Sequence, residues 1–159
     1  MSMATRIIRP EMTPSPPIEL RHMMGELYVT IQRKEDYIEA KWQGHITADN
    51  VVCAAKAYLE LLRKDPCPKL LNDKSEVTGD WQEANDWLQF EWLPQALGAG
   101  LRYMAHVYSF SMFSRLAVRE LEERITPQLS MKNFYERRLA EEWLLEQDDT
   151  TAGRRAATA

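Results

Sequence analysis

Cysteine is scarce in this chain, which has only Cys53 and Cys67 among its 159 residues. Two cysteines at this separation are too few and too widely spaced for a metal site or a redox pair. We therefore interpret both side chains as reduced thiols with a minor structural role.

The sequence also lacks long apolar runs and an excess of basic residues. No apolar run approaches the length of a membrane span, and residues 1–17 lack the apolar core of a signal peptide. Both observations favour a cytoplasmic protein without a membrane span. The formal net charge is −4, so no overall positive field attracts nucleic acid.

Motifs of catalytic and cofactor-binding sites are missing as well. The chain has no G-x-S-x-G nucleophile motif and no H-x-x-x-H or H-E-x-x-H spacing for a metal. Gly98 and Gly100 precede a predicted strand instead of joining a strand to a helix, so they do not form a phosphate loop. The sequence therefore predicts a non-enzymatic protein without cofactor or metal.

What the chain does contain is an ordinary globular mixture, with 45% hydrophobic and 28% charged residues. Its length favours one domain with tails. Residues 1–22 carry Pro10, Pro14, Pro16 and Pro17 and predict a flexible N-terminal arm. The domain is expected over residues 23–147, and the small polar residues 148–159 predict a disordered tail.

Hydrophobic periodicity predicts an α/β domain with the element order ββαβαβαβα. The expected strands are 27–33, 37–43, 69–72, 101–108 and 129–134, and the expected helices follow Thr47 and cover 80–97, 111–125 and 136–146. The first two strands are expected to form an antiparallel hairpin. The alternation of strands and helices after them predicts a mixed, mostly parallel sheet with helices packed on it. Residues 101–108 are apolar on both faces and predict an interior strand, whereas 129–134 predicts an edge.

Three of the expected helices carry apolar residues at helical spacing, which predict their buried stripes. These residues are Val52, Ala55, Leu59 and Leu62 in the first helix, Phe113, Ala117, Leu121 and Ile125 in the third, and Leu139, Trp143 and Leu144 in the last.

The segment 72–81 is the most informative part of the sequence, because it is expected to form a loop between a buried strand and a helix. In open α/β sheets, ligands and partners bind outside the carboxyl ends of the strands. The candidate partner- or ligand-binding residues at these ends are Asn72, Asp73, Thr78, Trp81, Ser109 and Phe110.

Acid–base chemistry at these ends would need residues that are separate in sequence to meet. Asp73 and Asp80 flank the predicted loop, but ending a strand and capping a helix explain them more simply. His45 follows a glycine in a loop and would act as a base only if Asp73 were adjacent. His106 lies on the interior strand and is expected to be a hydrogen-bonded core residue.

The predicted helix 80–97 is unusually aromatic. Trp81, Ala84, Leu88 and Trp92 form one helical row, and Trp87, Phe90 and Leu97 form an adjacent one. A wide core stripe is one explanation. The other is that part of this surface contacts a protein partner, a second copy of the chain or an apolar ligand.

Four sequence landmarks follow one another at similar spacing in a known family. They are Trp42-Gln43-Gly44-His45-Ile46-Thr47, Leu70–Asp73 with Val77–Trp81, Glu91-Trp92-Leu93-Pro94, and Ala140-Glu141-Glu142-Trp143-Leu144. With these landmarks in this order, the chain resembles the STAS-like family, which has the SpoIIAA-like fold of bacterial anti-sigma-factor antagonists. It resembles above all a small bacterial branch of that family. The topology is also similar to the CRAL-TRIO lipid-transfer fold.

The resemblance implies an α/β regulatory or interaction module over about residues 25–146, with one departure. The family's phosphorylatable serine at a helix start is replaced here by Thr78-Gly79-Asp80-Trp81. We therefore expect no phosphorylation switch at this position.

Our leading hypothesis is a protein-interaction module that presents loop 72–81 and the following helix to a partner. A homodimer through helix 80–97 is the simplest form of self-association. The alternative is binding of a small apolar or amphipathic, lipid-like ligand at the carboxyl ends of the strands.

Overall fold

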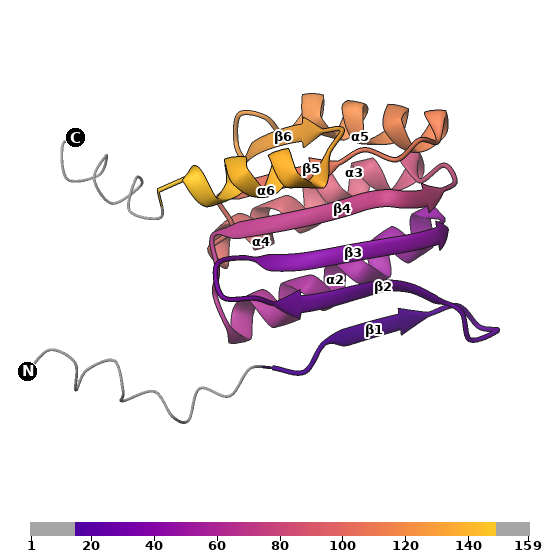
Figure 1. Ribbon diagram of the computed structural model, residues 1–159, viewed down its shortest axis with the longest axis horizontal. Coiled ribbons are helices and arrows are strands. Elements are labelled where there is room, and N and C mark those ends of the chain that lie inside the picture. Colours follow the sequence, from indigo (N-terminus) through magenta and orange to yellow (C-terminus); the bar gives the residue numbers. More distant parts are fainter. Residues whose placement is uncertain (1–14, 149–159) are drawn as a thin grey trace, which may run out of the picture.

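The computed structural model describes residues 15–148, which form one six-stranded sheet with the spatial order β1-β2-β3-β4-β5-β6 (Figure 1). The first three strands pair antiparallel, and β3 to β6 pair parallel. The strands are β1 (Ile18–Arg21), β2 (Leu27–Arg33), β3 (Ile38–His45), β4 (Lys69–Thr78), β5 (Tyr103–Val107) and β6 (Ser130–Phe134).

Helices cover the two faces of the sheet unequally. One face carries α2 (Ala48–Lys64), the helical segment between β4 and β5, and α5 (Met112–Ile125). The other face carries α6 (Arg137–Glu146), which packs across β4, β5 and β6 and leaves β1 to β3 uncovered (Figure 1). Accordingly there are two hydrophobic clusters, a large one beneath α2 to α5 and a small one of Tyr37, Leu71, Ala105, Val107, Ala140 and Leu144 beneath α6.

The sequence explains where α2 begins and ends. The Thr47 hydroxyl accepts a hydrogen bond from the Asn50 backbone N–H, and the Asn50 side chain bonds the Thr47 backbone N–H in return. Asp49 in the first turn and the basic residues of the last turn favour the helix dipole. The helix stops at Asp65, just before Pro66.

The predicted mixed α/β sheet is confirmed, including the hairpin, the interior β5 and the edge position of β6. The prediction missed β1, which lies in residues assigned to the flexible arm and pairs with β2. Ile18 and Leu20 alternate with charged residues and pack against the core, but four residues are too short a pattern to distinguish from a loop. Most of the predicted arm and tail lies outside the described residues.

Strand β4 is the largest difference from the prediction, because it continues to Thr78 instead of ending at Asn72. Its second half pairs with β3, so that Glu76, Val77 and Thr78 lie opposite Gln43, Gly44 and His45. The predicted loop 72–81 is thus mostly strand. Two of its acidic residues, Asp73 and Glu76, are paired with Lys41 of β3. Lys74, between them in sequence, is instead buried against the indole rings of Trp42 and Trp81.

The predicted helix 80–97 is broken into four short pieces. A 3₁₀ turn (Gln82–Ala84) leads into α3 (Asn85–Trp87), a π turn (Leu88–Trp92) and α4 (Leu93–Gly98). Pro94 lies in the first turn of α4 and has no N–H to donate to the preceding turn. The expected disruption at Pro94 therefore takes the form of a wide turn before it, closed by a hydrogen bond from the Leu93 N–H to the Leu88 carbonyl.

Two of the predicted stripes extend too far. Phe113 is 61% exposed and Leu139 is 40% exposed, whereas the other members of their stripes are buried or partly buried. Both residues lie near the start of a helix. Periodicity alone does not show how far along a helix its apolar stripe is covered.

Candidate functional site

The predicted binding residues do not form one site. Trp81 is fully buried, so it belongs to the core and cannot be the aromatic contact that we expected at a partner surface. The Trp42 indole N–H donates to the Asn72 side-chain oxygen at 2.7 Å, which holds Asn72 beneath the helix layer. Thr78 is exposed, and its hydroxyl lies 3.3 Å from His45 Nδ1.

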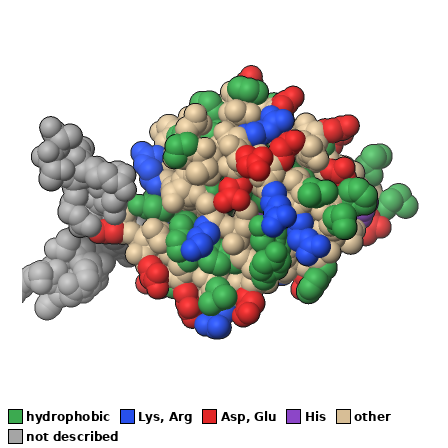
Figure 2. All heavy atoms as spheres, turned by 90° about the horizontal axis from the view of Figure 1, so that it is seen from above, with side chains coloured by type: hydrophobic (Ala, Val, Ile, Leu, Met, Phe, Trp, Pro, Cys, Tyr) green, Lys and Arg blue, Asp and Glu red, His purple; other side chains and the backbone are tan. Residues whose placement is uncertain are grey.

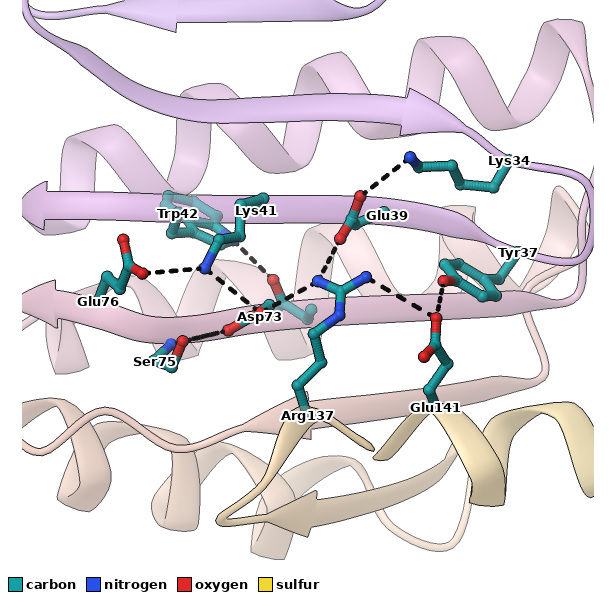
Figure 3. Close-up of polar contacts among 11 residues, drawn as sticks. Lys34, Tyr37, Glu39, Lys41, Trp42, Asp73, Ser75, Glu76, Arg137 and Glu141 are labelled. Carbon is teal, nitrogen blue, oxygen red and sulfur yellow. Dashed lines mark hydrogen bonds and ion pairs between the residues drawn. The ribbon is translucent and has the colours of Figure 1, made fainter. Parts of the chain in front are cut away.

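Asp73 lies on the opposite face of β4, in a network of charged side chains (Figure 3). Ser75 donates to one carboxylate oxygen through its backbone N–H at 3.0 Å and its hydroxyl at 2.7 Å. The other oxygen lies 3.4 Å from Lys41 Nζ and 3.2 Å from Arg137 Nη1. Burial alone would raise the pKa of Asp73, but the Ser75 hydrogen bonds and the two cations outweigh it and hold the pKa below its usual range.

The same network connects α6 to the sheet. Arg137 also pairs with Glu39 of β3, and Tyr37 donates a hydrogen bond to Glu141 of α6. Figure 3 shows the Arg137 side chain reaching from the start of α6 toward both carboxylates. Every oxygen of Asp73 has a donor, so the arrangement suits attachment of α6 and leaves no free lone pair for a general base.

The contact between His45 and Asp73, on which an acid–base site would depend, does not form. Lys41 lies opposite Asp73 in the β3–β4 register, and His45 lies opposite Thr78, farther along the same pair. At ~3.3 Å per residue, His45 and Asp73 are separated by over ~10 Å along the sheet. Asp80 instead accepts a hydrogen bond from the Gln82 N–H at 3.0 Å, in the turn after β4.

The junction between β5 and α5 is fixed against the end of β4 by two serines. Ser109 is buried, and its hydroxyl donates to the Val77 carbonyl at 2.6 Å and accepts from the Ser111 N–H at 2.8 Å. The Ser114 hydroxyl donates to the Gly79 carbonyl at 2.6 Å. Gly79 has φ +111°, and a Cβ there would lie 2.2 Å from the Ile46 carbonyl oxygen, so only glycine fits.

This fixed junction carries an exposed apolar surface, which we call the α5 patch. Its members are Phe110, Met112, Phe113, Leu116 and Tyr135, of which Phe110 is 93% exposed. Figure 2, seen from the side of α5 and β6, shows hydrophobic side chains gathered at the end where α5 begins. Leu116 lies close to both Met112 and Phe113 on the helix surface, because it follows them by four and three residues.

A second cluster lies inside the molecule, around Lys74. This side chain is 2% exposed and extends over two indole rings, with Nζ 3.7 Å from the centre of Trp81 and 4.7 Å from that of Trp42. Burial lowers the pKa of Lys74 to about 7. His106 is also buried, no described residue hydrogen-bonds to either ring nitrogen, and burial followed by the nearby Lys74 charge lowers its pKa well below the usual value.

Sequence reasoning missed Lys74, Arg137 and most of the α5 patch. Lys74 follows Leu70 and Asn72 at a spacing of two, so its inward orientation would follow from a strand of the correct length. Phe113 was assigned to a buried stripe. His106 is buried, as predicted, but no described residue forms the hydrogen bond that we expected for its ring.

The described residues contain neither a metal-binding cluster nor a membrane-spanning helix. No group of three or more His, Cys, Asp or Glu side chains is arranged to hold a metal ion between residues 15 and 148. In the same part of the chain, no helix is long and apolar enough to cross a membrane.

Comparisons with known proteins concern the fold. No family model matches the chain, and no curated protein matches it. Among solved structures, it is similar to an uncharacterized protein of the DUF3478 family from Shewanella loihica PV-4, which has a SpoIIAA-like fold. The two are 21% identical with a TM-score of 0.48, and the match covers 84% of this chain and 98% of the other. The SpoIIAA-like fold is the one that the sequence motifs led us to expect.

Proposed function

We propose that this chain is a non-enzymatic protein-interaction module whose binding surface is the α5 patch. The observation that carries the proposal is the exposure of five large hydrophobic side chains together on one end of the molecule. Exposed apolar clusters reduce solubility and are usually retained for contact. The surface replaces the one predicted from the sequence, since Trp81 is buried and segment 72–81 is mostly strand.

The rigidity of the junction supports this assignment. Ser109 and Ser114 hold the start of α5 against the end of β4, so Phe110 is presented from an ordered turn. A partner that binds a preformed surface loses less conformational entropy than one that must order a loop.

The charges beside the patch indicate the chemistry of the partner. Arg115 and the exposed Arg119 lie on the same helix, and Arg119 lies beside Tyr108 and Tyr135. Tyrosine and arginine side chains are enriched in binding hot spots. We therefore expect a partner segment with apolar side chains flanked by carboxylates.

A lipid-like ligand is less well supported. The apolar cavity under α2 has a volume of about 50 Å³, whereas pockets for drug-sized ligands measure roughly 300–1,000 Å³, so an acyl chain has no room in it. A second hollow, of about 610 Å³ at the carboxyl end of β3, is large enough but is lined mostly by polar residues such as Gln43, His45 and Asn50.

Site-specific crosslinking tests the interaction proposal. A photoreactive phenylalanine analogue replaces Phe110 in one variant and the exposed Leu145 of α6 in a matched control. We expect one discrete crosslinked protein from position 110 in cells of the native host, none from position 145, and loss of the product when Leu116→Glu is added. Equal crosslinking from both positions, or none from position 110, would contradict the proposal.

A further inference from the structure

The cavity of about 50 Å³ lies between the sheet and the helices that cover it. Its walls are mostly apolar, and its polar side chains include Tyr58, Asn72 and Lys74. Leu70, Asn72 and Lys74 are alternate residues of β4, so they face the cavity together and Lys74 lies nearest the carboxyl end of the strand.

Lys74 has no carboxylate within ion-pair distance among residues 15–148, and its Nζ lies over the indole faces of Trp42 and Trp81. Buried lysines are ordinarily paired, because an isolated ammonium is costly to remove from water. The Tyr58 hydroxyl on the same cavity is also buried without a hydrogen-bond partner in the described part of the chain. Polar groups without partners on an apolar cavity are the arrangement expected of a ligand site.

A buried amine of this kind differs chemically from a surface lysine. Burial lowers the pKa of Lys74 to about 7, which leaves a large neutral fraction at neutral pH, although the indole faces favour the charged form. A neutral amine in an apolar pocket is the form that attacks carbonyl groups. His106, opposite Asn72 in the β4–β5 register, stays neutral and has both ring nitrogens free of described partners.

We propose that Lys74 is a carbonyl-capture residue, which forms a reversible imine with a small neutral aldehyde or ketone that enters this cavity. Apolar walls disfavour a charged ligand, and the volume admits only a few non-hydrogen atoms. This site is separate from the α5 patch, and the proposal does not depend on the interaction function.

The reaction needs no further co-reactant. The Nζ lone pair forms a bond to the carbonyl carbon while the C=O π pair moves to oxygen, and one amine proton is transferred to that oxygen. The C–O bond of this carbinolamine then breaks, the second amine proton leaves with the oxygen as water, and a C=N bond remains. Hydrolysis reverses both steps.

Reductive trapping tests the assignment on the full chain. Acetaldehyde and cyanoborohydride are added at pH 7, and peptide mass spectrometry follows the appearance of an ethyl group on each lysine. We expect Lys74 to react more than about tenfold faster than other lysines, because a lysine with an ordinary pKa is almost fully protonated at this pH.

The chain provides its own controls. Lys56 and Lys132 are exposed, and Lys69 is buried on the same strand without lining the cavity. Fast modification of Lys74 alone, absent in Lys74→Met, supports the proposal. Modification of Lys74 at or below the rate of Lys56 and Lys132 would overturn it, because Lys74 would then be only a core side chain.

Discussion

The Arg137 guanidinium lies 3.2 Å from the buried Asp73 carboxylate, across the junction between α6 and β4. Lys41 of β3 approaches the same carboxylate from the other side, so one anion connects a helix and two strands. The network thus joins the start of α6 to the sheet, next to the strands that carry no helix on this face (Figures 1 and 3).

Asp73→Asn should therefore lower the free energy of unfolding. The variant leaves two cations facing a neutral amide, and we expect a loss of about 2 kcal/mol at pH 7, measured by urea unfolding. Asp36→Asn is the matched control, because Asp36 lies in an exposed turn.

The pH dependence of this effect follows from the direction of the pKa shift. The pKa of Asp73 is lowered in the folded protein, so its contribution is fully present above the unfolded pKa near 4 and is lost as the pH falls through the folded pKa. The difference between wild type and Asp73→Asn should shrink in strong acid. A difference that is constant from pH 7 to pH 2 would contradict this role.

Lys74→Met should stabilise the protein. Folded Lys74 has a pKa near 7, so the unfolded chain binds more protons between about pH 7 and pH 10.5, and wild-type stability rises with pH over this window. Methionine fills similar volume without a charge, and we expect a gain on the order of 2–5 kcal/mol at pH 7.

Thermal unfolding of both proteins from pH 7 to pH 9.5 measures this dependence. The wild-type melting temperature should rise across the window, while that of Lys74→Met should stay nearly level. A variant less stable than wild type would show that the Lys74 contacts with Trp42 and Trp81 outweigh the burial of its charge.

The sequence was sufficient for the fold class and for most strands, but not for β1, the full length of β4 or the site, and β4 shows why. The apolar residues before Asn72 predict a strand. The polar residues that follow continue this strand because their side chains pair with residues distant in sequence, as Asp73 does with Arg137. No local pattern reports a partner 64 residues away. The same limitation applies to Trp81, whose apolar character shows that it is buried somewhere but does not distinguish the core from an interface.

Ser109→Ala should destabilise the junction that presents the α5 patch. The substitution removes the bond to the Val77 carbonyl and leaves this buried acceptor and the Ser111 N–H without their partner. We expect a loss of about 1–2 kcal/mol in urea unfolding. Ser130→Ala on the exposed face of β6 should change stability by less than about 0.5 kcal/mol. Equal effects of the two variants would contradict the role given to Ser109.

Phe90→Ala tests self-association through the helical segment 80–97. We expect some of the four large aromatic residues of this segment to be only partly buried; Trp81 and Trp92 are buried, whereas Phe90 is 65% exposed and Trp87 is partly exposed. A two-fold dimer would cover Phe90 with the same surface of a second copy. We expect the variant to keep its fold and to weaken dimerisation at least about tenfold, as loss of a central aromatic contact does.

Sedimentation equilibrium over a wide concentration range measures this change, with Leu145→Ala as the control on the opposite face. Both variants remove one exposed apolar side chain, so only a specific interface separates them. A wild-type protein that stays monomeric at high concentration would exclude the dimer and leave Phe90 as an isolated surface residue. Such a result would leave the α5 patch unaffected, because Phe110 lies at the β5–α5 junction and Phe90 in the π turn before α4.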